Sequence, residues 1–465
     1  RGAHAVTETP PGLSGATWNN LNTGLTYVRH GRYYYSQLRP GTYRTELLTP
    51  RSLPVPPFWK LLSDAGRRVA VVDVPKTFPT AGLNGIQVVD WGNHDADILE
   101  GFLTWPPELR DTLDARFGPD PFDRRAFGSR GLPDMEALVT GLGANIERKT
   151  RFVLDLLDQE PWDLLFAAWD DTHWAGHYTW RQHDTRHPHH DPDLAARLGN
   201  PLSTIYAAAD RCIGEILERV GDETAVFVLS SHGMDGNYRT RVTLEAILRR
   251  LDASRKGRGL AYRTLRRIWD NLPGQVHRPL AYFRESVRES VMEKDRARRR
   301  HFALPCNNDT GTIRLNVVGR EPEGRVRPGA EYDALCDWLS ETLLAVVDAD
   351  TGEPMIDQVY RIADLTGGDI HHGLPDLAVR WHQGPPVRRI ASPAIGEIEV
   401  AVEPWRSGEH TPRGFLLSVA PGVAPGPVGA TVRTQDLAPT IGHILGVPMP
   451  GLDGAVIDEM VPRAG

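Results

Sequence analysis

The residues best suited to chemistry in this 465-residue chain are four histidines in three short polar segments. His173 and His177 share the first segment, His232 lies in the second and His410 lies in the third. Each segment adjoins an apolar run that predicts a buried strand, at residues 164–169, 225–229 and 415–419. Functional groups gather where the strands of a parallel sheet end, and neutral imidazole is a preferred zinc ligand. The sequence therefore predicts that these histidines converge on a metal ion.

The spacing of the first pair supports this interpretation. Residues four apart lie on one face of a helical turn, so His173 and His177 would present both imidazoles to one ion. With His410 they form a three-histidine set that leaves one coordination position open, as in catalytic zinc sites. Asp171 is a candidate accessory ligand, or a carboxylate that orients an imidazole. The alternative for each histidine is an ordinary core or surface role, and for Asp171 an ordinary loop acid.

Ser14 is the candidate nucleophile. It follows a proline-containing loop and begins a stretch, residues 14–24, that predicts a short helix closed by Gly24. Serine is a favoured N-cap residue, and the local sequence alone favours that structural role for Ser14. The functional alternative is a nucleophile or anion contact at the positive end of the helix.

The elements that would position these residues alternate between strands and helices. Apolar runs at 68–74 and 85–91 predict further buried strands, and residues 134–160 and 201–220 predict helices. This alternation is typical of an α/β fold, with three α/β/α layers around a mainly parallel central sheet. The first 30 residues contain no strand-like run. We therefore expect that the first strand is missing, together with any signal peptide that preceded it.

The segment 239–303 differs from the rest because basic residues crowd it, above all between 255 and 300. We interpret it as a helical lid inserted into a catalytic core of residues 1–238 and 304–465. A basic lid would attract an anionic substrate or an acidic partner, and the alternative is a solvated helical surface.

Composition excludes several classes of function. The net charge of −7 gives no reason to expect a nucleic-acid polymer as partner, and the three cysteines form no CxxC pair. No stretch approaches the roughly 18 apolar residues of a membrane span. We favour a cytoplasmic location for the chain, and the sequence does not indicate its oligomeric state.

Taken together, the chain resembles the alkaline phosphatase superfamily, and most of all its type I phosphodiesterase and nucleotide pyrophosphatase branch. The resemblance spans nearly the whole chain and depends on four blocks that occur in the family's order. They are Pro10-Pro11, Ser14, Trp18, Thr23-Gly24 and His30-Gly31; then Gly176-His177 with Trp180; then residues 230–234; and finally residues 410–414 with 434–440 and Gly446.

The resemblance implies one or two zinc ions and a seryl nucleophile. Ser14 lies where the family places its nucleophile, nine residues before Thr23, and Thr17 is the fallback. His232 would belong to a second metal. The family pattern usually has Asp where this chain has His173 and Ser231, and it takes another Asp from the first strand. The change at Ser231 removes a carboxylate, so we expect the second metal to bind more weakly.

The function that these residues favour is metal-dependent hydrolysis of a small anionic phosphate ester. The resemblance implies a phosphodiesterase that acts through a seryl-phosphoryl intermediate. One alternative is a sulfatase or phosphonate hydrolase on the same fold, although the residues after Ser14 lack the Pro and Arg of the formylglycine sulfatases. Another is a non-catalytic descendant that binds an anion.

Overall fold

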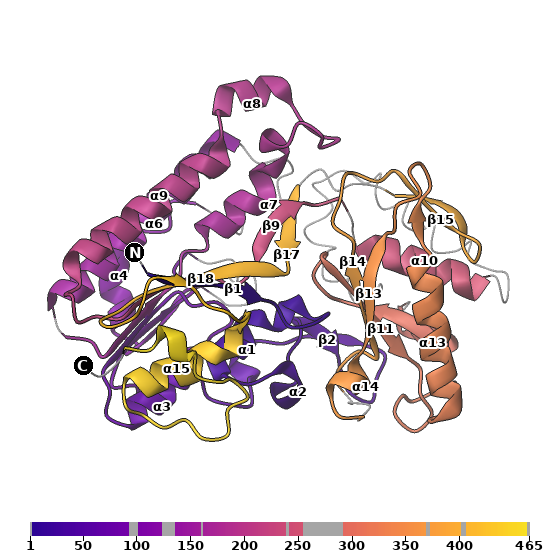
Figure 1. Ribbon diagram of the computed structural model, residues 1–465, viewed down its shortest axis with the longest axis horizontal. Coiled ribbons are helices and arrows are strands. Elements are labelled where there is room, and N and C mark those ends of the chain that lie inside the picture. Colours follow the sequence, from indigo (N-terminus) through magenta and orange to yellow (C-terminus); the bar gives the residue numbers. More distant parts are fainter. Residues whose placement is uncertain are drawn as a thin grey trace.

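The computed structural model describes residues 2–92, 101–122, 135–159, 161–238, 241–253, 292–368, 373–400 and 406–462. The described chain forms two lobes that lie side by side in Figure 1. We call residues 2–238 and 406–462 the core lobe, and residues 241–400 the inserted lobe. The predicted α/β class is confirmed.

The core lobe contains two main sheets. In the first, with the order β19-β1-β18-β8, strand β18 pairs antiparallel with both β1 and β8, and β20 joins at β1. In the second, with the order β6-β5-β4-β7, the central strand β4 is parallel to β5 and β7. The bounds are β1 (Ala3–Glu8), β4 (Val69–Val72), β5 (Gly85–Val89), β6 (Leu103–Trp105), β7 (Leu164–Ala167), β8 (Val226–Ser230), β18 (Arg413–Val419), β19 (Gly426–Pro427) and β20 (Val432–Arg433).

Helices pack on both faces of strand β4, which explains its uninterrupted apolar sequence. Val69 and Val71 pack with α3 (Phe58–Asp64) and α15 (Leu437–Ile444). Ala70 and Val72 face the other way, toward α4 (Leu109–Phe117) and α6 (Met135–Gln159). All four side chains are fully buried. The central strands therefore provide a rigid platform for the loops and helices at their ends.

The remaining elements of the core lobe surround this platform. A 3-10 turn at Ser14–Ala16 leads into α1, which ends at Gly24 with a φ of 67°. The helices are α1 (Thr17–Thr23), α2 (Tyr27–His30), α7 (Asp171–His183), α8 (Pro192–Leu198) and α9 (Pro201–Arg219). The small sheets pair β2 (Ser36–Leu38) with β3 (Thr45–Leu47), and β9 (Gly233–Gly236) with β17 (Gly408–Thr411).

The inserted lobe has its own sheets and its own apolar core. Antiparallel strands run in the order β10-β11-β14-β13, and a smaller antiparallel sheet has the order β12-β15-β16. The strands are β10 (His301–Leu304), β11 (Thr310–Leu315), β12 (Val347–Asp348), β13 (Ile356–Arg361), β14 (Leu377–Trp381), β15 (Arg389–Ser392) and β16 (Gly396–Glu399). The helices are α10 (Arg241–Ala253), α13 (Ala330–Leu344) and α14 (Ile362–Leu365).

Two expectations about chain organisation are wrong. The core does not resume at residue 304, because the strands from 301 to 399 pair with one another and not with the core sheets. The insertion is therefore longer than a lid of residues 239–303, and most of the basic segment, residues 254–291, lies outside the described residues. In addition, the expectation that the first 30 residues hold no strand is wrong, because they contain β1, which pairs with β18 along its whole length.

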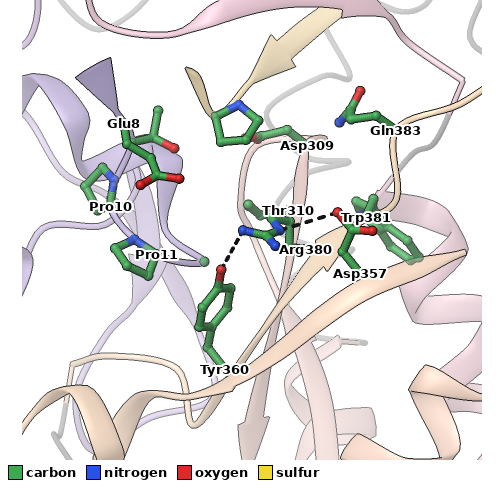
Figure 2. A pocket seen from close by; sticks show the side chains of 13 residues that line it. Glu8, Pro10, Pro11, Asp309, Thr310, Asp357, Tyr360, Arg380, Trp381 and Gln383 are labelled. Carbon is green, nitrogen blue, oxygen red and sulfur yellow. Dashed lines mark hydrogen bonds and ion pairs between the residues drawn. The ribbon is translucent and has the colours of Figure 1, made fainter. Parts of the chain in front are cut away.

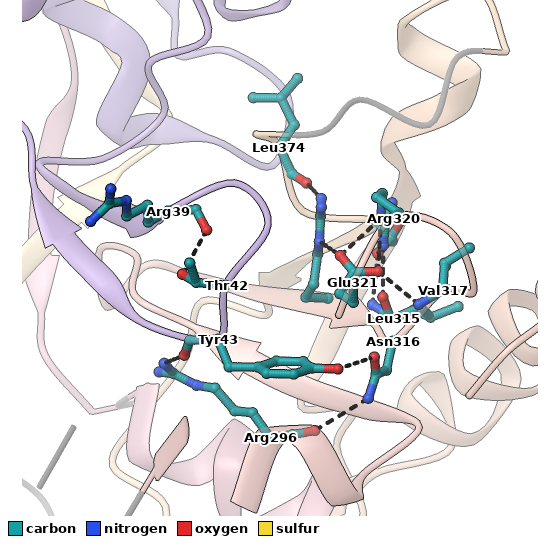
Figure 3. Close-up of polar contacts among 12 residues, drawn as sticks. Arg39, Thr42, Tyr43, Arg296, Leu315, Asn316, Val317, Arg320, Glu321 and Leu374 are labelled. Carbon is teal, nitrogen blue, oxygen red and sulfur yellow. Dashed lines mark hydrogen bonds and ion pairs between the residues drawn. The ribbon is translucent and has the colours of Figure 1, made fainter. Parts of the chain in front are cut away.

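Polar contacts join the core lobe to the inserted lobe (Figure 3). Tyr43, from the core lobe, donates its hydroxyl to Asn316 Oδ1 at 2.8 Å, and Arg296 Nη1 donates to the carbonyl of Tyr43 at 2.7 Å. Behind this contact, Arg320 bonds both carboxylate oxygens of Asp376 at 2.7 Å inside the inserted lobe. These buried bonds fix the orientation of the inserted lobe against the core lobe.

Within the described residues, no helix combines the length and the apolar character that crossing a membrane requires.

Candidate active site

Helix α7 carries the first two histidines to the junction of the lobes. The ring centres of His173 and His177 lie 4.3 Å apart, and their Nε2 atoms are 3.1 Å apart. The i, i+4 spacing therefore places both imidazoles on one helix face, as expected. His177 is buried and donates its Nδ1–H to the carbonyl of Gly408 at 2.8 Å. This bond orients the ring and leaves the lone pair on Nε2.

Two glycines allow α7 and β17 to approach closely enough for that bond. A Cβ atom at Gly408 would lie 2.0 Å from the carbonyl oxygen of Gly176, which is backbone and cannot move aside. A Cβ at Gly176 would lie 2.5 Å from the Cε of Met234. Packing therefore explains the glycine before His177, because only glycine fits where α7 contacts β17.

His410, on β17, lies among the other histidines. Its ring centre is 5.0 Å from that of His173, 4.9 Å from that of His177 and 3.9 Å from that of His232. The side chain is only 8% exposed, and its Nε2 has no hydrogen-bond partner among the described residues. A buried polar atom without a partner is costly, and a metal ion would satisfy this one.

Burial favours the neutral form of three of these imidazoles. It lowers the pKa of His177 and His410 well below the usual value, and the neighbouring positive charge of Arg406 and the other imidazoles act in the same direction. Burial also lowers the pKa of His232, which follows β8. A neutral imidazole offers the lone pair that a metal needs, so the rings of His177, His232 and His410 are held in the form suited to ligation.

Ser14 makes side-chain contacts to the inserted lobe. Its Oγ donates to Asp309 Oδ1 at 2.8 Å and accepts from Asn307 Nδ2 at 3.1 Å. Ser14 is not an N-cap, because Leu13 occupies that position and no side chain caps the turn. The fallback, Thr17, donates its hydroxyl to the carbonyl of Ser14 at 2.6 Å.

Asp309 connects the serine with the histidines. Ligand atoms of Asp309, Glu409 and His410 all lie within 4.8 Å of one another, and those of His173, His177 and His410 form a similar group. Burial, and next the charge of Glu409, raise the pKa of Asp309 to about 7. A carboxyl group with such a pKa, bonded to a serine hydroxyl, is suited to accept its proton near neutral pH.

Asp171 lies apart from these groups. It is fully buried at the start of α7, where it accepts a hydrogen bond from Asn145 Nδ2 of helix α6 at 2.8 Å. The structure brings together the four predicted histidines and places Asp309 between His410 and Ser14, but it does not add Asp171 to either group of candidate ligands.

A pocket opens beside Asp309, between the lobes (Figure 2). The loop that precedes Ser14 forms one wall, and the inserted lobe forms the other. Arg380 projects into it, held by the hydroxyl of Tyr360 at 2.8 Å and lying 3.6 Å from a carboxylate oxygen of Asp357. A smaller hollow that is also lined by Asp309 reaches Glu409 and His410.

Four residues of the site escaped sequence reasoning. Asn307 and Asp309 lie in the turn between β10 and β11, where Asn and Asp are common for conformational reasons alone. Arg406 and Glu409 precede His410 in the third histidine segment. The position of Glu409 directly before His410 could have marked it as a candidate metal ligand. No sequence pattern marks Asn307 and Asp309 as site residues, because their role depends on how the two lobes pack against each other.

The sequence over residues 1–321 matches the family model of type I phosphodiesterase / nucleotide pyrophosphatase. The chain belongs to this family. It is accordingly a phosphoric ester hydrolase, and the predicted resemblance to type I phosphodiesterases and nucleotide pyrophosphatases is confirmed. No curated protein sequence matches the chain.

Solved structures of similar fold cover nearly the whole chain. Alkaline phosphatase PafA has a TM-score of 0.50 at 11% identity, covering 99% of this chain and 91% of its own. Phosphonoacetate hydrolase from Sinorhizobium meliloti 1021, in complex with phosphonoacetate, has a TM-score of 0.49 at 12% identity, covering 94% and 86%. Human ectonucleotide pyrophosphatase / phosphodiesterase 5 has a TM-score of 0.47 at 12% identity, covering 98% and 89%.

Proposed function

We propose that the chain is a metal-dependent phosphodiesterase that works through a seryl-phosphoryl intermediate. The observation that carries the proposal is the contact of Ser14 Oγ with Asp309, whose carboxylate lies beside His410. Family membership supports the reaction class, and this contact supports the choice of nucleophile.

The residues present fit a zinc ion. His173, His177 and His410 offer imidazole nitrogens in one group, and among the described residues the buried Nε2 of His410 has no hydrogen-bond partner. His232 adjoins His410 and would contribute to a second ion. A bound zinc would act as a Lewis acid on the phosphoryl oxygen and steady the negative charge that develops there.

The chain's own groups then arrange the transfer. Asp309 accepts the proton of the Ser14 hydroxyl as the serine oxygen forms a bond to phosphorus, and the bond from phosphorus to the leaving alcohol oxygen breaks. The leaving oxygen takes a proton from solvent water and departs as an alcohol, and Asp309 returns its proton to the serine oxygen when the intermediate is hydrolysed. Asn307, which donates to the serine oxygen, holds it in line during the attack. Water next hydrolyses the seryl phosphodiester, giving a phosphate monoester and restoring the hydroxyl.

The direct test is hydrolysis of an aryl phosphodiester by the full-length protein, with Ser14→Ala and Thr17→Val compared. We expect Ser14→Ala to lose at least about a thousandfold in kcat and to lose the covalent adduct on the Ser14 peptide, because the nucleophile is gone. Thr17→Val should keep most of the activity, since the Thr17 hydroxyl bonds backbone. Activity that survives in Ser14→Ala would contradict the proposal.

The class of ester needs a second comparison. Relative rates on aryl phosphate, aryl phosphodiester and aryl sulfate separate a phosphodiesterase from a sulfatase, and a phosphonate substrate tests the remaining alternative. A cytoplasmic location stays a prediction.

A further inference from the structure

Arg406 occupies an unexpected place in the site. It lies just before β17, and its Nη2 donates to His177 Nε2 at 2.8 Å. Its Nε and Nη2 also donate to Glu409, at 2.9 Å to Oε2 and 3.1 Å to Oε1. One guanidinium therefore bridges the imidazole group and the carboxylate beside it.

The contact with His177 uses the same lone pair that a metal would need. Nδ1 of His177 carries the hydrogen and donates to the carbonyl of Gly408, so Nε2 is an acceptor, which Arg406 Nη2 contacts at 2.8 Å and His173 Nε2 at 3.1 Å. An imidazole nitrogen has one lone pair in the ring plane. A guanidinium N–H and a metal ion cannot share it, and their positive charges repel each other at this distance.

We propose that Arg406 is an internal competitor for the metal, one that holds Nε2 of His177 in the metal-free protein and leaves it when the metal binds. This inference rests on the proposed metal-binding role of His177. The competition lowers the affinity of the site for metal by the free energy needed to break the contact. It also keeps the buried imidazole satisfied when no ion is present.

The released guanidinium has a second use. Glu409 keeps hold of its Nε, so the side chain stays in the site, where its charge acts on both Asp309 and His410. A guanidinium with free N–H groups is a strong ligand for phosphoryl oxygens. Metal binding thus converts Arg406 from a partner of His177 into a donor for the anionic substrate.

The test measures binding without turnover, on the full-length protein, by titration calorimetry with Zn²⁺ alone. Arg406→Met should bind Zn²⁺ at least about tenfold more tightly than the wild type, the factor that one charged hydrogen bond represents. After zinc loading, the same variant should bind inorganic phosphate at least about tenfold more weakly, by the same reasoning. Opposite signs for the two ligands are not expected from general damage to the site.

Arg413→Met is the matched control, because it removes an exposed positive charge three residues after His410 and should change Zn²⁺ affinity less than twofold. A zinc affinity in Arg406→Met equal to or below that of the wild type would overturn the inference. A second measurement uses the wild type alone: saturating Zn²⁺ should speed phenylglyoxal modification of Arg406, and an unchanged or slower rate speaks against it. If the wild type binds no Zn²⁺, the proposed metal site fails and this inference fails with it.

Discussion

The contact between α7 and β17 yields a prediction whose size follows from the structure. In Gly408→Ala the new Cβ would lie 2.0 Å from the carbonyl oxygen of Gly176. Ordinary carbon–oxygen contacts are about 3.3–3.6 Å, so the two backbones must separate by more than ~1 Å. The 2.8 Å bond from His177 Nδ1 to the Gly408 carbonyl would then break.

Two costs follow from this separation. Overpacking a well-packed contact costs about 1–3 kcal/mol, and the lost hydrogen bond costs about 0.5–1.5 kcal/mol. We therefore expect the free energy of unfolding of Gly408→Ala to fall by about 2–4 kcal/mol. Because His177 also loses the bond that orients its ring, Zn²⁺ affinity should fall about 10–100-fold.

The assay combines urea unfolding with a Zn²⁺ titration, and Gly214→Ala is the matched control. Gly214 lies within α9, and an added Cβ there meets no atom within 4 Å. That variant should gain about 0.5–1 kcal/mol from helix propensity and keep its Zn²⁺ affinity. If Gly408→Ala unfolds and binds Zn²⁺ like the wild type, the glycine is not what allows this approach.

Three further predictions concern single side chains. Asp309→Asn keeps an acceptor for the Ser14 hydroxyl but not a base, so kcat on an aryl phosphodiester should fall about 10²–10⁴-fold; a loss under threefold would exclude the base role. Asp376→Asn breaks a buried pair with Arg320, whose side chains are 2% and 5% exposed, and urea unfolding should show a loss of about 3–5 kcal/mol, with Zn²⁺ affinity unchanged. Burial, and next Arg32, lower the pKa of His30 to about 4, so its contribution to stability is complete above pH ~6.5 and lost toward pH ~4. Relative to His30→Gln, the wild type should lose up to about 3 kcal/mol over that window, and a pH-independent difference would contradict this reasoning.

Local patterns in the sequence determined much of the fold. The apolar run at 68–74 contains β4, and the predicted helix that Gly24 closes ends there with the left-handed φ that glycine favours. The missed strand β1 has a physical explanation. Its buried face consists of the small residues Ala3, Ala5 and Thr7 while the apolar Val6 is exposed, so the usual alternation of large apolar and polar side chains is absent.

The site was predictable only in part. The imidazoles could be found because their segments adjoin strand ends and because two of them are four residues apart. Asp309 could not be found, because its contact with Ser14 joins residues 295 positions apart on different lobes. The lobe boundary was predicted wrongly for the same reason, because the sequence does not show which sheet residues 301–304 join.

The division of the site between lobes has a mechanical consequence. The imidazoles on α7, after β8 and on β17 move with one body, whereas Asn307 and Asp309 move with the other. Rotation of the inserted lobe about the contact between Tyr43 and Asn316 would separate Ser14 from Asp309. The same rotation would leave the group of histidine ligands intact. Metal content therefore reports on the core lobe, and turnover reports on the contact between the lobes. Separation of the lobes would produce a chain that binds its metal ion but does not turn over substrate.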